Sequence, residues 1–424
     1  MKQSSYHLFL EKVARLKIIF YNFRDLSSLF KITSLSSSVL PTTSSTAMIT
    51  ADSSDNVWPN SKDDYRLDDI LGRGATANVY KAHCPPRNED CVVKRVVLEK
   101  CHICMTELNN EVCNLRMCNH RNIVKYHTSF IVRNELWLVM GIQKAGSLFD
   151  IITYKWQVTN CKNGVFDEVT IATVLKEILK GLEYLHSSGY MHRDIKSSNI
   201  LVGNDGSVKI CDFGLSTFLG TKNNLIYKAV GTPYWMAPEV ILKTCGYNSK
   251  ADIWAVGIIG LEMITGFPPN HLETPVRVLL ITRQNEALTV DSVSFEVNQY
   301  KIYSEKFRNF LTKCLQKDPA LRSPATELLS HTFFDEACTP HHIVKILLPF
   351  SPTLRKLTNK DNEVDMFSSV NSTRYSNTTS ITELLNVTPE ATVSKGQQAP
   401  DLFEENNSDE FYAMKTETEY EITI

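Results

Sequence analysis

The stretch His192-Arg-Asp-Ile-Lys-Ser-Ser-Asn199 combines three chemically distinct side chains within a few residues. Asp194 can accept the proton of a hydroxyl group, or orient that hydroxyl, and Lys196 can neutralise a nearby phosphate. Asn199, five residues after Asp194, offers an amide oxygen of the kind that binds a divalent metal ion. A surface loop could carry any one of these residues, so their meaning depends on the motifs around them.

Two further motifs follow downstream. Asp212-Phe-Gly214 offers a carboxylate that would bridge phosphate groups through Mg²⁺. Ala237-Pro-Glu239 closes the 28-residue segment that begins at Asp212. A chance occurrence of these motifs in this order and at these spacings is negligible, which indicates a site for phosphate chemistry.

Upstream, a glycine-rich stretch runs from Gly72 to Val79 between two strand-like segments. Gly72 and Gly74 would let a hairpin approach phosphates closely, with backbone N–H groups facing them. The third glycine of the usual pattern is replaced by Ala77. Taken alone, the stretch is also consistent with an ordinary turn.

Lys94 ends the run Val92-Val93-Lys94 on the next predicted strand, among apolar neighbours. A lone lysine on a strand usually faces solvent. Glu111 follows inside a helical pattern of apolar residues, so the two side chains could form an ion pair. Lys94 would then hold the α- and β-phosphates of a nucleotide, and Glu111 would hold Lys94.

The composition is that of an ordinary globular protein. Of the 424 residues, 43% are hydrophobic and 22% are charged, which excludes collagen-like and wholly disordered chains. No apolar run approaches the length that spans a bilayer. The net charge of −2 gives no global basic field to attract nucleic acid. We therefore expect no nucleic-acid partner and no transmembrane segment.

The 11 cysteines are scattered along the chain, and we interpret them as reduced thiols of a cytoplasmic protein. Cys101-His-Ile-Cys104, with Cys113, Cys118 and His120 nearby, offers a zinc site as the alternative. Against it, the second Cys-x₂-Cys pair of many structural zinc sites is missing.

The two ends of the chain do not have the pattern of a packed domain. In residues 1–60, apolar residues recur at helical spacing between Phe9 and Phe20, among basic residues, before a Ser/Thr-rich run. We favour a disordered extension with one short helix, and mitochondrial targeting by residues 1–40 is the alternative. The Ser/Thr-rich, acidic composition of residues 340–424 predicts a disordered tail.

Between these ends, residues 65–334 have the dense pattern of a folded domain. The expected strands are 65–71, 78–82, 91–97, 123–130 and 135–140. The expected helices are 105–118, 148–154, 168–187, 249–265, 305–314 and 325–329. This order predicts an α+β fold, with a small β-rich lobe at about 65–143 and a larger, mainly helical lobe at about 144–334.

With these motifs, residues 65–334 resemble a complete, two-lobed eukaryotic protein-kinase domain. The Asp-Ile-Lys-Ser-Ser-Asn sequence around Lys196 resembles the serine/threonine class, and Gly231-Thr-Pro-Tyr-Trp-Met-Ala-Pro-Glu239 is similar to the Sterile-20-like group. Within that group, the chain resembles the oxidative-stress-responsive and proline-alanine-rich (germinal-centre) subgroup. The matching stretches are 74–77, 98–101, 135–140 and 315–319.

The resemblance implies an ATP-dependent serine/threonine protein kinase that uses Mg²⁺, with Mn²⁺ as an alternative metal. The implied catalytic residues are Asp194, Lys196, Lys94 and Glu111, and the implied metal ligands are Asn199 and Asp212. Met140 would be the gatekeeper beside a hinge at 141–143. The residues expected to bind ATP are Leu71, Gly72, Arg73, Gly74, Ala75, Thr76, Ala77, Asn78, Val79, Val92, Lys94, Met140, Ile142 and Gln143.

The resemblance also implies internal supports for these residues. Leu115, His192 and Phe213 would stack as the regulatory spine. Glu239 and Arg322 would form a buried ion pair in the large lobe. We expect Asp252 to support the backbone of the catalytic loop rather than to take part in the chemistry.

Two positions depart from the family pattern. Val92 stands where most kinases have alanine above adenine, which predicts a slightly tighter pocket. Lys228 stands where the subgroup's activating threonine would be, four residues before Thr232, and its charge cannot pair with Arg193. We therefore expect an activation loop that needs no phosphate, and phosphorylation of another loop hydroxyl is the alternative.

Relatives in this subgroup act between WNK-type upstream kinases and cation-chloride cotransporters. By resemblance we expect such partners in addition to protein substrates. The subgroup's C-terminal docking domain is not recognisable in residues 340–424. The competing function is a pseudokinase-type scaffold that activates a partner kinase without transferring phosphate. The presence of Lys94, Asp194 and Asp212 favours the enzyme.

Overall fold

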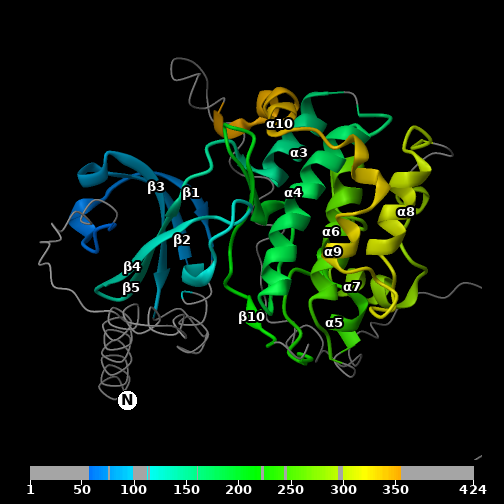
Figure 1. Cartoon of the computed structure of the whole chain (residues 1–424), viewed down its shortest axis with the longest axis horizontal. Coiled ribbons are helices and arrows are strands. Elements are labelled where there is room, and N and C mark those ends of the chain that lie inside the picture. Colours follow the sequence, from blue (N-terminus) through cyan, green and yellow to red (C-terminus); the bar gives the residue numbers. More distant parts are fainter. Residues whose placement is uncertain are drawn as a thin grey trace, which may run out of the picture. The chain divides into compact units, whose positions relative to one another are not determined.

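The computed structural model describes residues 57–74, 77–98, 112, 115–159, 161–220, 224–242, 246–294 and 299–354. Figure 1 shows these residues in colour. Three predicted site residues, Ala75, Thr76 and Glu111, lie outside the described residues. The same holds for residues 1–56 of the extension predicted at 1–60, for residues 355–424 of the tail predicted at 340–424, and for most of the helix predicted at 105–118.

Five antiparallel strands form the sheet of the first lobe (Figure 1). They are β1 (Arg66–Arg73), β2 (Ala77–Cys84), β3 (Glu89–Val97), β4 (Tyr126–Val132) and β5 (Glu135–Gly141). The order in the sheet is β1-β2-β3-β5-β4, so the chain leaves β3 and returns to pair β5 with it.

Alternation along β3 gives the sheet two different faces. Val93 is fully buried in an apolar core on one face, together with residues of β2, β4 and β5. Val96, which shares the other face with Lys94, is buried in a second core. That second core contains Val96, Leu98, Val112, Leu136 and Leu138. Apolar packing on both sides therefore fixes the strand that carries Lys94.

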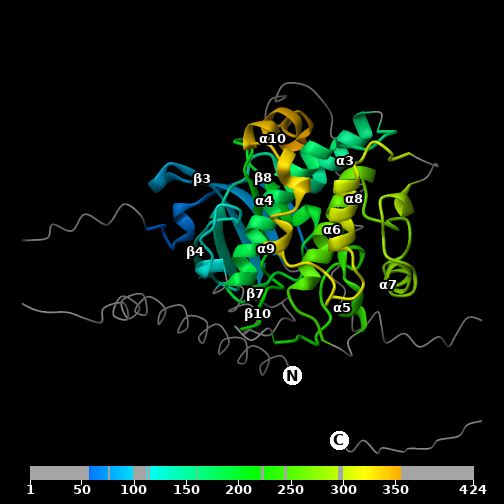
Figure 2. The same cartoon turned by 45° about the vertical axis from the view of Figure 1, so that its right-hand side comes forward.

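Helices dominate the second lobe (Figure 2). They are α3 (Leu148–Val158), α4 (Glu168–Ser187), α5 (Pro238–Leu242), α6 (Lys250–Thr265), α7 (Pro275–Gln284), α8 (Glu305–Cys314) and α9 (Ala325–Leu328). None of the helices that the structure describes is long and apolar enough to cross a membrane.

Helix α6 lies at the centre of this lobe, against α4 and α8 (Figure 2). Every residue from Ala251 to Ile264 is buried, as expected for a helix that is apolar on all sides. Gly257 allows the close approach of the chain that follows α8, because a Cβ atom there would stand 2.7 Å from the Cγ atom of Leu315.

Five short strands lie where the predicted motifs meet. β6 (Gly146–Ser147), β8 (Ile200–Val202) and β9 (Val208–Ile210) form one small sheet, and β7 (Tyr190–Met191) pairs with β10 (Thr217–Phe218). The catalytic loop connects β7 to β8, and the Asp-Phe-Gly motif begins one residue after β9, beyond Cys211. Paired strands thus fix both ends of each motif.

The structure confirms the predicted two-lobed α+β fold. The strand predicted at 123–130 begins later, at Tyr126, because Ile123 makes only a single bridge, to Ile210. Helices α5 and α7 were not predicted from the sequence. Helix α5 is short and begins at Pro238, and α7 buries only Val278 and Leu279, so neither has a strong apolar period.

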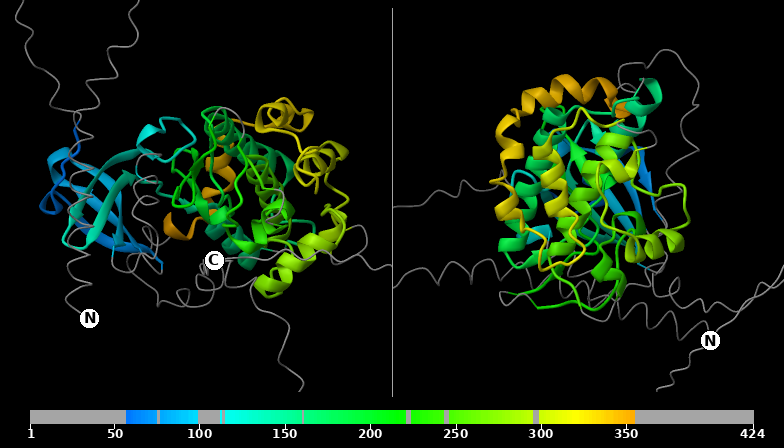
Figure 3. Two further views of the ribbon diagram at one scale, coloured as in Figure 1. Left: turned by 90° about the horizontal axis from the view of Figure 1, so that it is seen from below. Right: turned by 90° about the vertical axis from the view of Figure 1, so that its right-hand side faces the viewer.

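One part of the predicted tail is folded. Residues 340–354, which we assigned to the tail, form α10 (Pro340–Ile346) and the 3₁₀ turn η8 (Leu348–Phe350). Helix α10, orange in Figure 3, packs against α4. Ile343 and Leu347 are fully buried, and Ser351 Oγ donates a 2.7 Å hydrogen bond to the carbonyl of Ala145. Polar residues dominate the composition of 340–424 as a whole, so composition did not indicate that Ile343 and Leu347 are buried.

We expect Ile343→Ala to lower the free energy of unfolding by about 2–5 kcal/mol, because it leaves a cavity between α10 and α4. Urea denaturation followed by circular dichroism measures the change. The control is Ile302→Ala, whose side chain is largely exposed and whose effect should stay within about 0.5 kcal/mol. Equal midpoints for the two variants would show that α10 does not contribute to the domain.

Candidate active site

Four side chains form the centre of the site. Lys196 Nζ lies 2.7 Å from Asp194 Oδ2 and donates a 2.8 Å hydrogen bond to Thr232 Oγ1. The Thr232 hydroxyl donates to Asp194 Oδ1 at 2.6 Å. Asn199 Nδ2 donates to the carbonyl and to Oδ2 of Asp194, at 2.8 and 3.1 Å. The carboxylate of Asp194 is therefore held in one orientation.

Asp252 on α6 supports the backbone of the catalytic loop. Its carboxylate accepts hydrogen bonds from the backbone N–H groups of His192 and Arg193, both at 2.9 Å. Arg193 has φ 69°, a conformation that side-chain-bearing residues adopt only under constraint. Burial alone would raise the pKa of Asp252, but hydrogen bonds and the positive field of His186 bring it below its ordinary value. The structure agrees with the supporting role predicted for this residue.

Lys94 of β3 contacts Asp212, which follows β9. The Nζ and Oδ1 atoms lie 2.7 Å apart. The positive charge of Lys94 lowers the pKa of Asp212 far below its ordinary value, so this carboxyl group is ionised. The ion pair joins the sheet of the first lobe to the catalytic segments of the second.

The orientation of Asp212 depends on the next residue. Phe213 is buried, and its ring packs edge-on against His192 with centroids 5.0 Å apart. His192 Nε2 also lies within hydrogen-bonding distance of the Cys211 carbonyl, at 3.0 Å. Leu115 belongs to the same apolar core as Phe213, which agrees with the predicted spine.

The expected ATP-binding residues line one end of the sheet. Strand pairing places Val79 opposite Lys94 and Val92 opposite Met140. Because directly opposed residues share a face, these side chains lie on the face of Lys94. Nearer the loop, β1 and β2 pair Gly72 with Val79 and Arg73 with Asn78, and the N–H of Gly74 donates to the Ala77 carbonyl at 2.8 Å. Leu71 is exposed beside this hairpin.

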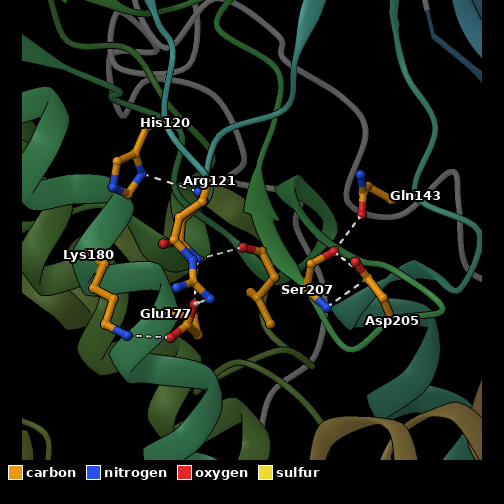
Figure 4. Close-up of polar contacts among 9 residues, drawn as sticks. His120, Arg121, Gln143, Glu177, Lys180, Asp205 and Ser207 are labelled. Carbon is orange, nitrogen blue, oxygen red and sulfur yellow. Dashed lines mark hydrogen bonds and ion pairs between the residues drawn. The ribbon is translucent and has the colours of Figure 1, made fainter. Parts of the chain in front are cut away.

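The chain beyond β5 carries the last expected ATP-binding residues, Ile142 and Gln143. Gln143 Oε1 accepts a 3.1 Å hydrogen bond from Ser207 Oγ in the turn between β8 and β9, which Figure 4 shows. The side chain of Gln143 is therefore directed to the second lobe, and its backbone accepts the N–H of Gly146.

A polar network that the sequence did not predict lies behind the site (Figure 4). Asn122 Nδ2 donates to Glu177 Oε2 at 2.7 Å and to the carbonyl of Val208 at 3.0 Å. Glu177 also accepts from Lys180 at 2.6 Å. Burial alone would raise the pKa of Glu177, but these hydrogen bonds bring it below its ordinary value. The network ties α4 to β9, the strand that delivers Asp212.

A second missed residue, Tyr247, anchors the activation loop. Its backbone exchanges two 2.9 Å hydrogen bonds with Ile226, and its hydroxyl donates to the carbonyl of Lys228 at 2.7 Å. Arg193 contacts the loop at another point, where its Nε donates to the carbonyl of Leu215 at 2.5 Å. Arg193 and Tyr247 thus each hold a backbone carbonyl of the loop, at Leu215 and at Lys228.

The ion pair predicted between Glu239 and Arg322 is present. Arg322 Nη1 and Nη2 donate to the two carboxylate oxygens of Glu239, at 2.5 and 3.0 Å, and both side chains are buried. The donors of a zinc site are not assembled in the described residues, where no group of three His, Cys, Asp or Glu side chains is placed to hold a metal ion. Cys101 and Cys104 lie outside them.

Comparison with known proteins agrees with this geometry. The model of the protein kinase domain family matches residues 65–334, so the chain belongs to the protein kinase family. Germinal center kinase 3 of Caenorhabditis elegans is 44% identical over 300 residues, which are 69% of this chain and 50% of that protein. Serine/threonine-protein kinase fray2 of Dictyostelium discoideum is 38% identical over 70% of this chain and 28% of its own length.

Serine/threonine-protein kinase STE20 of Candida glabrata is 36% identical over 69% of this chain and 30% of its own length. These relatives confirm the predicted Sterile-20-like, germinal-centre assignment. The chain spans half the length, or less, of these curated relatives.

We expect Tyr247→Phe to lower the activity of unphosphorylated protein by about fivefold, because a hydrogen bond worth about 1 kcal/mol no longer holds the Lys228 carbonyl of the loop. Peptide phosphorylation by protein produced in bacteria with a co-expressed phosphatase measures the effect. The control is Tyr227→Phe, since Tyr227 is a largely exposed residue of the same loop. An unchanged rate for Tyr247→Phe would show that the hydroxyl does not order the loop.

Proposed function

We propose that the protein transfers the γ-phosphate of ATP to serine and threonine hydroxyls of protein substrates. The observation that carries this proposal is the contact among Asp194, Lys196 and Thr232, formed together with the ion pair between Lys94 and Asp212. Positioning and charge stabilisation supply most of the catalysis in phosphoryl transfer. A site with both contacts in place meets that requirement.

Each residue has a definite task in this mechanism. Asp194 would orient the substrate hydroxyl and accept its proton, and Lys196 would neutralise charge on the phosphate in transfer. Lys94 would hold the phosphates of the bound nucleotide. Asp212 and Asn199 supply a carboxylate and an amide oxygen, the hard oxygen donors that fit Mg²⁺ or Mn²⁺. The bound metal ion would neutralise phosphate charge.

The contact between Lys196 and Thr232 supports a preference for serine and threonine, together with the resemblance of the loop to that class. Phosphoamino-acid analysis of a labelled substrate protein should give phosphoserine and phosphothreonine. A predominance of phosphotyrosine would contradict the class. The scaffold alternative predicts no labelling at all, together with activation of a separate kinase on addition of the protein.

Location and partners are proposed from the sequence and its resemblance. We propose a cytoplasmic protein, with mitochondrial targeting by residues 1–40 as the alternative. A WNK-type upstream kinase and ion cotransporters are the partners that the resemblance suggests. Fusion of residues 1–40 to a fluorescent protein tests the targeting alternative. Retention of the fusion in the cytoplasm would exclude mitochondrial targeting by this segment.

We expect Asp194→Asn to lower kcat by about 10²–10⁴-fold and Lys94→Met by about 10²–10³-fold, because they remove the proton acceptor and a phosphate-binding charge. Radiolabelled ATP with a generic basic substrate protein measures transfer. Asp291→Asn, at a largely exposed position, is the control and should behave as the wild type. Thermal unfolding should show all three variants folded. Transfer at wild-type rate by Asp194→Asn would refute the assigned role.

Regulation gives a separate prediction. If the loop needs no phosphate, phosphatase treatment should leave wild-type activity unchanged. Lys228→Thr should then create a form whose activity rises when an upstream kinase is supplied, because a phosphothreonine there could pair with Arg193. The comparison is activity before and after phosphatase, for both forms. Equal inactivation of the two by phosphatase would place an activating phosphate elsewhere in the loop.

A further inference from the structure

A buried carboxyl group lies beneath the active site and takes no part in the mechanism above. Glu262, on α6, has no exposed surface. Ser197 Oγ and Glu262 Oε1 lie within hydrogen-bonding distance, 2.6 Å apart, and Trp235 Nε1 donates to Oε2 at 3.2 Å. The two partners belong to separate segments of the site, which are 38 residues apart in the sequence.

These contacts close a ring through the catalytic centre. Ser197 follows Lys196 directly, and Trp235 lies in the turn η5 (Pro233–Trp235) that begins after Thr232. The N–H of Trp235 donates to the carbonyl of Thr232 at 3.1 Å. Lys196 and Thr232 then meet at 2.8 Å on the opposite side of the ring. Glu262 is therefore bonded to both segments that hold the orientation of Asp194.

None of the described cations is placed to balance a charge on Glu262. The charged and titratable groups on the elements around it have other contacts. Lys196 contacts Asp194 and Thr232, and Asp252 accepts hydrogen bonds from the His192 and Arg193 backbone. Tyr234 donates to the Glu273 carbonyl, and Lys155 of α3 lies over the rings of Phe166 and Phe350. On α4, Glu177 contacts Lys180 and Asn122. Burial raises the pKa of Glu262 to about 8, although its two hydrogen bonds act in the opposite direction. The group is thus mostly neutral at pH 7.

We propose that Glu262 is a positioning residue, which acts as an uncharged carboxyl group to keep the catalytic loop and the Thr232 segment in register. A neutral carboxyl can donate one hydrogen bond and accept another, so it can satisfy Ser197 and Trp235 without placing a net charge in the core. An ionised carboxyl can only accept, and it would be a buried anion without a cation. The proposal rests on the proposed kinase function.

The test compares Glu262→Gln with Glu262→Ala. Glutamine has the shape of the neutral acid, and its amide can donate to Ser197 Oγ while it accepts from Trp235. We expect Glu262→Ala to lower kcat at least tenfold at pH 7, with a KM for ATP within about twofold of wild type. Glu262→Gln should recover most of that loss. If Glu262→Ala does not fold, Ser197→Ala should show a smaller loss of kcat, because it removes only one of the two contacts of Glu262.

The pH dependence supplies a readout that a purely structural role would not change. As pH rises through about 8, Glu262 ionises, so wild-type kcat should fall relative to that of Glu262→Gln. The stability of the folded state should also fall as the pH rises. A carboxyl whose pKa is higher in the folded than in the unfolded state weakens folding progressively from pH 4.5 to about 8. The urea midpoint of the wild type should therefore fall relative to that of Glu262→Gln across this window.

Glu177→Gln is the matched control, because Glu177 is also a largely buried carboxyl but contacts Lys180. Its pKa is lowered, so its contribution is present at neutral pH and lost in acid, and Glu177→Gln should be less stable than the wild type at pH 7. Ionisation therefore destabilises the folded state at Glu262 and stabilises it at Glu177.

Three results would overturn the proposal. Glu262→Gln could be as inactive as Glu262→Ala, which would mean that the charge is required. The loss in Glu262→Ala could lie in the KM for the peptide alone, which would mean that Glu262 contacts the substrate. The urea midpoints of wild type and Glu262→Gln could stay parallel from pH 5 to 9. Because unfolding needs no phosphotransfer, an inactive wild type would refute the proposed function, while this comparison still decides whether Glu262 is neutral.

Discussion

The carboxylate of Asp252 accepts two backbone N–H groups of the catalytic loop, and the orientation of the active site depends on this interaction. The N–H groups belong to His192 and Arg193, and the second of these residues has an unfavourable left-handed backbone. A fully buried carboxylate can impose that conformation because α6 is closely packed on all sides, so the helix cannot shift to relieve it. The next residue is Asp194, so the direction of its side chain follows from that of the loop.

Electrostatics then links the two lobes. Each carboxylate of the proposed mechanism, Asp194 and Asp212, lies 2.7 Å from a lysine, so the centre is close to neutral before a nucleotide arrives. A triphosphate adds several negative charges to this balanced site. A divalent cation bound through Asp212 and Asn199 would compensate them, which explains why oxygen ligands stand beside the lysines.

The sequence predicts this centre well because its residues lie in short motifs. Asp194 and Asn199 are five residues apart in one loop, and their mutual contact is local. The period of two along β3 also places Lys94 on the correct face. Contacts that depend on how separate elements approach each other could not be predicted in the same way. Glu262 and Ser197 are 65 residues apart, and Asn122 and Glu177 are 55 apart. Neither pair belongs to a motif that would indicate the contact.

Helix α10 has a practical meaning for anyone who makes fragments of this protein. The family match ends at residue 334, which makes this residue an obvious choice for the C-terminus of an expressed fragment. A fragment cut there would lose Ile343 and Leu347, leave part of α4 uncovered, and remove the donor to the Ala145 carbonyl just beyond the hinge. Newly exposed apolar surface promotes aggregation. A recombinant kinase domain should therefore extend to residue 354, even though the sequence beyond 334 no longer matches the family model.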